Sequence, residues 1–263
     1  MKNGISVIKI GGALVTESGA PDVFWRSVKA FTERSDIVVV HGGGPHATRV
    51  ARMIGHEPTF VHGRRVTGDL DLEIVQWTMR GALNVRLVGQ AARFGLRPVG
   101  ICGADDAILK VHRRPPQQID GQEIDFGWVG DVEDVDVDLL QLLVNHGRTP
   151  IVAPLGIDDQ GQLYNVNADT VATSLAVMLE ADELVMVADM GGVRRDPDDP
   201  ATTIPHLGPQ DHKQGVDEGW ISAGMRAKLE NAFLACSSGI PAVRIVGPED
   251  LDAPDSGTII SLP

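Results

Sequence analysis

Residues 38–55 read VVVHGGGPHATRVARMIG, and this stretch decides the fold class of the chain. An apolar run enters three glycines and a proline, and an amphipathic helical pattern follows that ends at Gly55. Glycine costs backbone entropy, so three in succession indicate a point where the backbone approaches another group closely. Consecutive N–H groups at the start of a helix also attract anions. We predict a strand, a helix and an anion site between them; a tight turn that binds nothing is the alternative.

A second strand ends in the same way. Ile5–Ile10 is apolar apart from Ser6 and Lys9, and Gly11 and Gly12 follow it at once. A lysine inside a buried strand is costly unless it meets an anion. We therefore expect Lys9 to point toward a phosphate group. The alternative is a solvent-facing position on the edge of a sheet.

Short apolar runs alternate with helical patterns along most of the chain. The expected strands are 5–10, 37–40, 97–102, 150–154, 183–188, 242–246 and 258–262. The expected helices are 21–34, 45–55, 70–94, 137–146, 168–180, 209–218 and 225–238. Continuous apolar strands between helices predict a mainly parallel sheet covered on both faces, with ligands at the carboxyl ends of the strands. Residues 107–135 differ, because alternation around Asp120 and Gly121 predicts a β-rich flap with a hairpin turn.

The composition restricts the class of partner. The chain has 263 residues, 43% of them hydrophobic, and a formal net charge of −13. This acidity argues against nucleic acid or an anionic membrane as the main partner. No apolar run of membrane-spanning length and no signal peptide is found, so we expect a cytoplasmic protein. Cys102 and Cys236 have no metal-site spacing and are expected to be reduced thiols.

Several signals have two interpretations at this level. Gly42, Gly44 and Ala47 fit G-x-G-x-x-A, a weak dinucleotide fingerprint, but the acidic residue that should follow about 20 residues later is replaced by Arg64 and Arg65. Two arginines suit a 2′-phosphate or, equally, a carboxylate.

Three polar residues later in the chain have ordinary structural explanations. Asn167 and Asp169 stand at the start of an expected helix, where an N-cap and a favourable dipole interaction explain them. Lys228 alone is most simply a surface residue.

Six motifs in order resemble the amino-acid kinase family. They are KIGG (9–12), HGGGP (41–45), GRRVT (63–67), NVNADTVA (165–172), DMGGV (189–193) and GMRAK (224–228). Each is weak alone, but six in order over essentially the whole chain are specific. The segments EPTFVHGRRVT and NVNADTVATSLA are most similar to the branch that phosphorylates the side-chain carboxylate of N-acetyl-L-glutamate, a step of arginine biosynthesis.

The resemblance implies an α/β fold of two lobes, a three-layer αβα sandwich with a mainly parallel central sheet. Residues 1–175 would form the N-terminal lobe, which binds the acyl substrate and dimerises, and 176–263 the C-terminal lobe, which binds ATP. Mg²⁺ would be held mainly by the nucleotide, with no metal ligands from the protein. The flap at 107–135 would lie over the substrate, and the protein would be a homodimer.

The resemblance also implies roles for individual residues. By position, Lys9 and Lys228 match the two family lysines that stabilise the transferring phosphoryl group, and Asp169 matches the aspartate that orients them. The residues that match acyl-substrate contacts are Gly43, Gly44, Arg65 and Asn165. The residues that match the nucleotide site are Gly11, Gly12, Asp189, Met190, Gly191, Gly192, Val193, Ile221 and Ser222.

The chain also departs from the family pattern. Asp106 replaces a glycine common in a G-x-D-G turn, Ala223 replaces the first of two common glycines, and Arg64 is an extra arginine without an assigned role. Arginine-inhibited members carry an N-terminal helix that forms hexamers. This chain begins only a few residues before its first strand, which favours a dimer that arginine does not inhibit.

Three other functions stay open. A kinase of the same fold could phosphorylate glutamate or a carrier-bound aminoadipate, although an acidic carrier would meet a net charge of −13 unfavourably. An NADP-binding oxidoreductase would use the G-x-G-x-x-A turn but would leave Lys228 and Asp169 without a role. A regulatory amino-acid-binding protein with an inactive kinase fold would not need both lysines and the aspartate.

Overall fold

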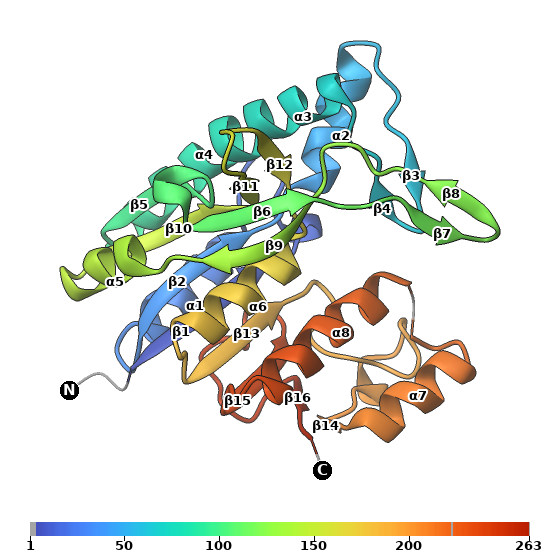
Figure 1. The fold of residues 1–263 in the computed structure, drawn as a ribbon. Coiled ribbons are helices and arrows are strands. Elements are labelled where there is room, and N and C mark those ends of the chain that lie inside the picture. Colours follow the sequence, from blue (N-terminus) through green and yellow to red (C-terminus); the bar gives the residue numbers. More distant parts are fainter. Residues whose placement is uncertain (1–3, 222, 263) are drawn as a thin grey trace.

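An eight-stranded sheet runs through the middle of the molecule (Figure 1). The computed structural model describes residues 4–221 and 223–262. The strand order is β14-β16-β15-β13-β1-β2-β10-β5, and neighbouring strands are parallel except for the antiparallel pair β15 and β16. The strands are β1 Ile5–Ile10, β2 Asp36–His41, β5 Pro98–Cys102, β10 Thr149–Ala153, β13 Glu183–Val187, β14 His206–Leu207, β15 Ala242–Val246 and β16 Thr258–Ile260. The predicted mainly parallel sheet is confirmed.

Helices cover both faces of this sheet, which makes the predicted three-layer sandwich. Because side chains alternate across a strand, Ile8 and Ile10 pack on one face and Val7 on the other. The first face meets α1 and α4, and the second meets α5, α6 and α8. The helices are α1 Asp22–Phe31, α2 Gly44–Met53, α3 Asp69–Val75, α4 Asn84–Arg93, α5 Asp138–Asn145, α6 Ala168–Met178, α7 Pro209–Asp217 and α8 Ala223–Ser237.

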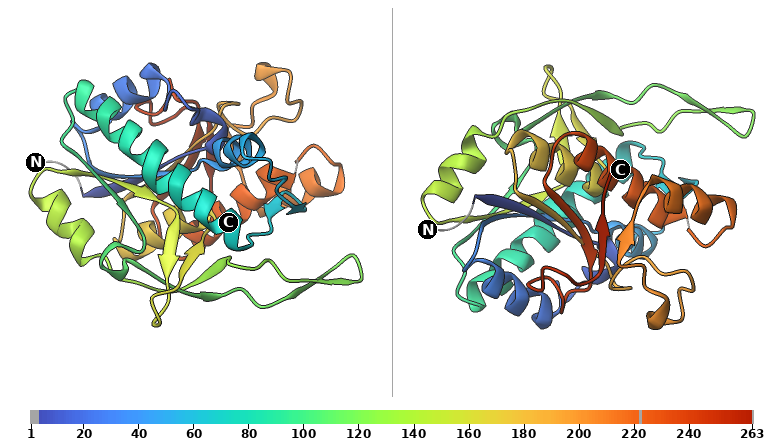
Figure 2. Two further views of the ribbon diagram at one scale, coloured as in Figure 1. Left: turned by 90° about the horizontal axis from the view of Figure 1, so that it is seen from above. Right: turned by 90° about the horizontal axis from the view of Figure 1, so that it is seen from below.

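The predicted flap at 107–135 forms a projecting hairpin and contributes β6 and β9 to a smaller sheet, whose other two strands come from residues 155–165 (Figures 1 and 2). The four-stranded sheet contains β6 Leu109–Arg113, β9 Gly130–Val135, β11 Leu155–Ile157 and β12 Leu163–Asn165. β7 Gln117–Ile119 and β8 Gln122–Ile124 form the hairpin. Its turn residues Asp120 and Gly121 both have positive φ, at 50° and 77°, as a tight hairpin turn requires. A second hairpin, β3 Phe60–Val61 with β4 Arg64–Arg65, lies beside it and was not predicted, because two-residue strands carry no readable alternation.

The predicted helix at 70–94 is continuous but changes its winding in the middle. α3 runs into a π-helical segment, η2 Gln76–Leu83, and then into α4. Such segments are rare and often lie at functional sites. Short 3₁₀ turns are η1 Gly12–Leu14, η3 Asp105–Ala107 and η4 Pro200–Thr202. Asp106, where the family often has glycine, has φ of 53° in the left-handed region that glycine favours.

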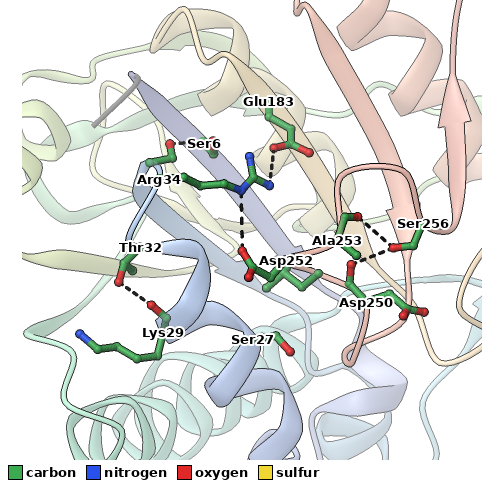
Figure 3. Close-up of polar contacts among 12 residues, drawn as sticks. Ser6, Ser27, Lys29, Thr32, Arg34, Glu183, Asp250, Asp252, Ala253 and Ser256 are labelled. Carbon is green, nitrogen blue, oxygen red and sulfur yellow. Dashed lines mark hydrogen bonds and ion pairs between the residues drawn. The ribbon is translucent and has the colours of Figure 1, made fainter. Parts of the chain in front are cut away.

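A buried charge cluster lies near the amino ends of β13 and β15, at the end of the sheet opposite the glycine loops. Glu183 accepts from Arg244 Nε at 2.5 Å and pairs with Arg34 Nη2 at 3.1 Å. Arg244 also donates to the backbone carbonyls of Ala253 and Leu251, at 2.7 and 3.0 Å. Figure 3 shows Arg34 reaching between Glu183 and Asp252. The cluster therefore fixes the connection between β15 and β16 against the sheet.

We expect Arg244→Ala to lower the free energy of unfolding by about 3 kcal/mol, because it removes one partner of a buried ion pair and the donors of two carbonyls. Urea denaturation measures this change. Arg226→Ala is the matched control, since its pair with Glu230 is exposed and worth about 0–1 kcal/mol. Equal losses in the two variants would show that burial adds nothing to the Arg244 pair.

Candidate active site

Two lysines from opposite ends of the chain meet on one carboxylate oxygen. Lys9 Nζ lies 2.7 Å from Asp169 Oδ1, and Lys228 Nζ lies 3.2 Å from the same atom. Lys9 is 5% exposed and Lys228 is 8% exposed. Two ammonium groups therefore stand within reach of a common point, at the carboxyl end of the central strand β1.

Local sequence rules explain how each member reaches this point. Lys9 shares its face of β1 with Val7, and this face packs against α6 and α8. Asn167 caps α6, since its Oδ1 accepts from the backbone N–H groups of Asp169 and Thr170 at 2.7 and 3.3 Å. The cap places Asp169 in the first turn of α6, where its carboxylate contacts the ammonium group of Lys9. Lys228 is buried, so the prediction that it is a surface residue is wrong. Lys9 is also buried, so the alternative of a solvent-facing position on a sheet edge is wrong as well.

The cluster shifts the acid–base behaviour of its members. Burial lowers the pKa of Lys9 to about 8, against the opposing effect of Asp169. Burial alone raises the pKa of Asp169, but the charges of Lys9 and Lys228 outweigh it and lower that pKa to about 2. Asp169 is therefore an anion at neutral pH, and the cluster carries a net positive charge whenever both lysines are protonated.

The two glycine loops pack directly against each other beside the lysines. A Cβ atom on Gly42 would lie 2.8 Å from the backbone N of Gly12, and one on Gly43 would lie 2.6 Å from Leu83 Cδ1. Neither position has room for a side chain. Gly43 precedes α2 as its N-cap residue and has no capping side chain, so the first N–H groups of α2 are directed at the space beside the lysines. The packing explains Gly42 and Gly43, whereas a Cβ on Gly44 would meet nothing within 4 Å. A helix start of this kind favours anions.

A buried hydrogen-bonded pair holds the second loop in place. The Nδ1–H of His41 donates to the Gly42 carbonyl at 2.8 Å, and Nε2 of His41 accepts from Asn84 Nδ2 at 3.1 Å. Asn84 also donates to the Ile151 carbonyl at 2.8 Å. Burial lowers the pKa of His41 to about 4, so the ring is neutral at physiological pH. His41 is therefore a hydrogen-bonded structural residue.

The acyl-substrate residues predicted from the family line one cavity with Lys9, Asp169 and the predicted nucleotide residue Gly12, whereas Lys228 is not among the described residues of its wall. This cavity, which we call the inner chamber, has a volume of about 290 Å³. The predicted residues in its wall are Lys9, Gly12, Gly43, Gly44, Arg65, Asn165 and Asp169. Asn165 Nδ2 donates to Thr67 Oγ1 at 3.2 Å, which orients its amide. The structure thus brings together residues that lie far apart in the sequence.

Arg65 enters the inner chamber already bound to protein groups. Its Nη1 lies 3.2 Å from Asp71 Oδ1, and its Nη2 donates to Thr48 Oγ1 at 2.6 Å. The guanidinium also lies over the ring of Phe60, 4.9 Å from its centroid. Arg65 is therefore preorganised in one orientation.

The predicted nucleotide residues lie at the carboxyl ends of neighbouring strands. The backbone N–H of Gly11 donates to the carbonyl oxygen of Val187, at the end of β13, at 3.0 Å. The turn after β13 contains Gly191 and Gly192 with positive φ, and Val193 donates to Thr258 Oγ1 at 2.8 Å. Asp189 and Met190 belong to the same turn, and Ile221 is buried just before α8. Ser222 lies outside the described residues. Among residues 4–221 and 223–262, segment 189–193 and Ile221 do not line the inner chamber.

Sequence reasoning missed several residues of this site. Thr48 and Asp71 hold Arg65, Asn84 holds the glycine loop, and Arg114 also lines the inner chamber. Thr48, Asp71 and Asn84 lie in helices and Arg114 follows directly after β6, and no local pattern marks any of them. The adjacent arginines at 64 and 65 predict an anionic ligand, and nothing in the sequence indicates that Arg65 pairs with Asp71.

The whole arrangement matches one protein class. The model of the amino acid kinase family matches residues 4–247, and the chain belongs to this family. Several curated relatives are acetylglutamate kinases. That of Anaeromyxobacter sp. strain Fw109-5 is 40% identical over 245 residues, which cover 92% of this chain and 90% of the relative. That of Methanopyrus kandleri is 38% identical over 256 residues, covering 97% and 100%.

Solved structures share the fold at lower identity. A protein of Streptococcus mutans UA159 superposes with a TM-score of 0.80 at 24% identity, covering 98% of each chain. N-acetylglutamate synthase from Neisseria gonorrhoeae, solved with coenzyme A and N-acetyl-glutamate, gives 0.80 at 23% identity, covering 99% of this chain and 60% of that one. Isopentenyl phosphate kinase of T. acidophilum gives 0.62. Fold class and family membership are thereby confirmed.

Proposed function

We propose that this chain is an acetylglutamate kinase, which transfers the γ-phosphoryl group of MgATP to the side-chain carboxylate of N-acetyl-L-glutamate. Curated relatives of this name at 34–40% identity over most of the chain support the acceptor. The observation that carries the mechanism is the convergence of Lys9 and Lys228 on Asp169 beside two glycine loops. The chain's membership of a kinase family leaves the NADP-binding oxidoreductase without support.

The reaction needs charge neutralisation more than proton transfer. A carboxylate is ionised at neutral pH, so its oxygen can attack the γ-phosphorus without a general base. One P–O bond forms, the bond to the bridging oxygen of ADP breaks, and ADP leaves. Two buried ammonium groups are placed to stabilise the charge on the transferring group, and the glycine loops offer N–H groups to the anions. Asp169 keeps the ammonium groups together between turnovers.

The remaining parts of the site are proposed from the same arrangement. Gly43, Gly44, Arg65 and Asn165 would bind the acceptor, and residues 189–193, Gly11, Gly12 and 221–222 the nucleotide. Mg²⁺, when bound, would neutralise part of the phosphate charge. The described residues contain no group of three or more His, Cys, Asp or Glu side chains that could hold a metal.

We further propose that residues 1–175 form a lobe that binds the acceptor and dimerises, and that residues 176–263 form a lobe that binds the nucleotide. Both lobes contribute strands to the same central sheet. No helix in the described part of the chain is long and apolar enough to cross a membrane. The cytoplasmic location and the homodimer stay predictions, which fractionation and light scattering would test.

Hydroxylamine trapping tests the proposed activity directly, because an acyl phosphate reacts with hydroxylamine to a hydroxamate. The enzyme would be incubated with MgATP and, separately, N-acetyl-L-glutamate, glutamate, aspartate and α-aminoadipate. We expect hydroxamate and ADP in equal amounts, with N-acetyl-L-glutamate as the preferred acceptor. A preference for another member of the panel would reassign the acceptor, and no product with any of them would contradict a kinase of free acids.

The pKa of Lys9 predicts an alkaline limit to this activity. Because Lys9 must be protonated to neutralise phosphoryl charge and its pKa is lowered to about 8, we expect kcat/KM to fall as the pH rises through about 8. Bound phosphates stabilise the ammonium form, so the fall in kcat should occur at higher pH. Initial rates between pH 6 and 10 measure both profiles. A kcat/KM that stays level to pH 10 would contradict the required protonation of Lys9.

A further inference from the structure

The imidazole of His41 is buried on the face of the central sheet that is opposite the lysine cluster. Because side chains alternate along β2, His41 shares its face with Val39, which packs with α1 and α4, whereas Val40 packs with α6 and α8. Lys9 and Asp169 lie on this second face. An effect of His41 on the reaction would therefore have to pass through the backbone that joins the two faces.

The partners of His41 fix the tautomer of its ring. Asn84 Nδ2 lies 2.8 Å from the carbonyl oxygen of Ile151, which only accepts, so this atom of the Asn84 amide is the nitrogen. The same nitrogen donates to His41 Nε2 at 3.1 Å, so Nε2 carries no proton. The ring proton is on Nδ1, which donates to the carbonyl of Gly42 at 2.8 Å. A Cβ atom on Gly100 would lie 2.3 Å from Asn84 Oδ1, so this glycine leaves the space that Asn84 occupies.

The hydrogen bond from His41 sets the direction of the peptide between Gly42 and Gly43. A trans peptide is planar, so its C=O and N–H point in opposite directions. The Gly42 carbonyl is directed at His41, on the side of α4, and the Gly43 N–H is therefore directed toward the side of Lys9. In agreement, a Cβ atom on Gly12 would lie 3.1 Å from Gly43 N, and Gly43 lines the inner chamber. Within 4–221 and 223–262, no acceptor is found for the Gly43 N–H, which leaves it for a ligand.

We infer that His41, held by Asn84, is a positioning residue that keeps the N–H of Gly43 directed into the inner chamber, at the phosphoryl group in transfer. This inference rests on the proposed function. Glycine on both sides of a peptide leaves no side chain to oppose its rotation, so an outside group has to select one orientation. In the opposite orientation the Gly42 carbonyl would face the negatively charged phosphoryl group, and a repulsive dipole would replace a donor.

The kinetic test removes the proton on Nδ1 and keeps the ring. For His41→Phe we expect kcat with MgATP and N-acetyl-L-glutamate to fall by about 10- to 100-fold, because the peptide would hold its productive orientation for only part of the time. The KM of each substrate should change less, since the donor acts on charge that develops during transfer. His41→Asn, whose amide N–H lies near the position of Nδ1, should recover most of the loss. Ser6→Ala is the control and should keep kcat, because it removes a buried hydrogen bond to Ser35 at the other end of the sheet.

Nitrogen-15 NMR of the wild-type imidazole tests the same arrangement without a variant that must fold and without activity. We expect a proton on Nδ1 and none on Nε2 of His41 between pH 6 and 8, since burial keeps the ring neutral there. The His41 signals are identified by their absence from His41→Asn. A ring that carries its proton on Nε2 would overturn the inference, because Nδ1 would then be unable to donate to Gly42.

Three kinetic results would also overturn the inference. Folded His41→Phe with the kcat of the wild type would show that the peptide needs no support from His41. A higher KM with an unchanged kcat would assign His41 to substrate binding. A rate for His41→Asn as low as that for His41→Phe would show that the bond from Nδ1 has no role in catalysis. If the wild-type enzyme makes no acyl phosphate from N-acetyl-L-glutamate, the proposed function fails instead, and the position of the ring proton still decides whether His41 holds Gly42.

Discussion

Replacing Lys9 with methionine is expected to lower kcat by about 10²–10⁴-fold, the cost of removing one preorganised charge donor. Methionine keeps the length and apolar volume of the side chain in the interior of β1, so the sheet should form. What disappears is the ammonium group 2.7 Å from Asp169. Because this group acts on charge that develops during transfer, the loss should appear in kcat more than in the KM of either substrate.

The measurement is steady-state ADP release with saturating MgATP and N-acetyl-L-glutamate. Lys110→Met is the matched control, since the pair of Lys110 with Asp159 is partly exposed and remote from the lysine cluster. A melting temperature close to that of the wild type would show that the Lys9 variant is folded. Turnover of folded Lys9→Met near the wild-type rate would end the proposed role of Lys9.

Replacing Asp169 with alanine is expected to lower the free energy of unfolding by about 3–5 kcal/mol, because two buried ammonium groups lose their shared counterion. The remaining positive charges repel each other, so the pKa of Lys9 should fall further and the alkaline limit of kcat/KM should move to lower pH. Urea denaturation and the pH profile measure these two consequences separately.

The pH dependence of stability gives Asp169 a second signature. Its folded pKa of about 2 lies below the usual value of 3.8, so it stabilises the fold above pH 3.8 and this contribution is lost as the pH falls toward 2. The Asp169→Ala protein should lack this part of the acid slope. Asp159→Ala, which breaks an exposed pair, should cost about 0–1 kcal/mol. If Asp169→Ala costs no more than this control, the buried cluster does not stabilise the fold.

The strands of the central sheet could be predicted because they are buried on both faces. Val38, Val39 and Val40 form a continuous apolar run, and such runs between helical patterns indicate a parallel sheet. Lys9 could be predicted because it is a single charged residue inside the apolar strand Ile5–Ile10, and a buried charge needs a partner. The hairpin turn at Asp120 was readable because its residues accept positive φ.

Other parts of the site could not be predicted because nothing local marks them. Lys228 on its own is indistinguishable from a surface lysine, and the family resemblance, not the helical pattern, singled it out. Asn84 holds His41 across 43 positions of sequence, and Arg65 is committed to Asp71. The π-helical segment at 76–83 has a sequence that reads as an ordinary helix.

The sequence by itself determined the α/β class, most elements of the sheet, the two glycine loops and, through six ordered motifs, the family. These features depend on local periodicity and on residues with unusual backbone freedom, which a linear pattern records. Only the tertiary structure decided that Lys9 and Lys228 bind the same oxygen of Asp169, and that Arg65 pairs with Asp71. Such pairings join residues from separate elements, and the packing of those elements, rather than any spacing along the chain, sets their distances.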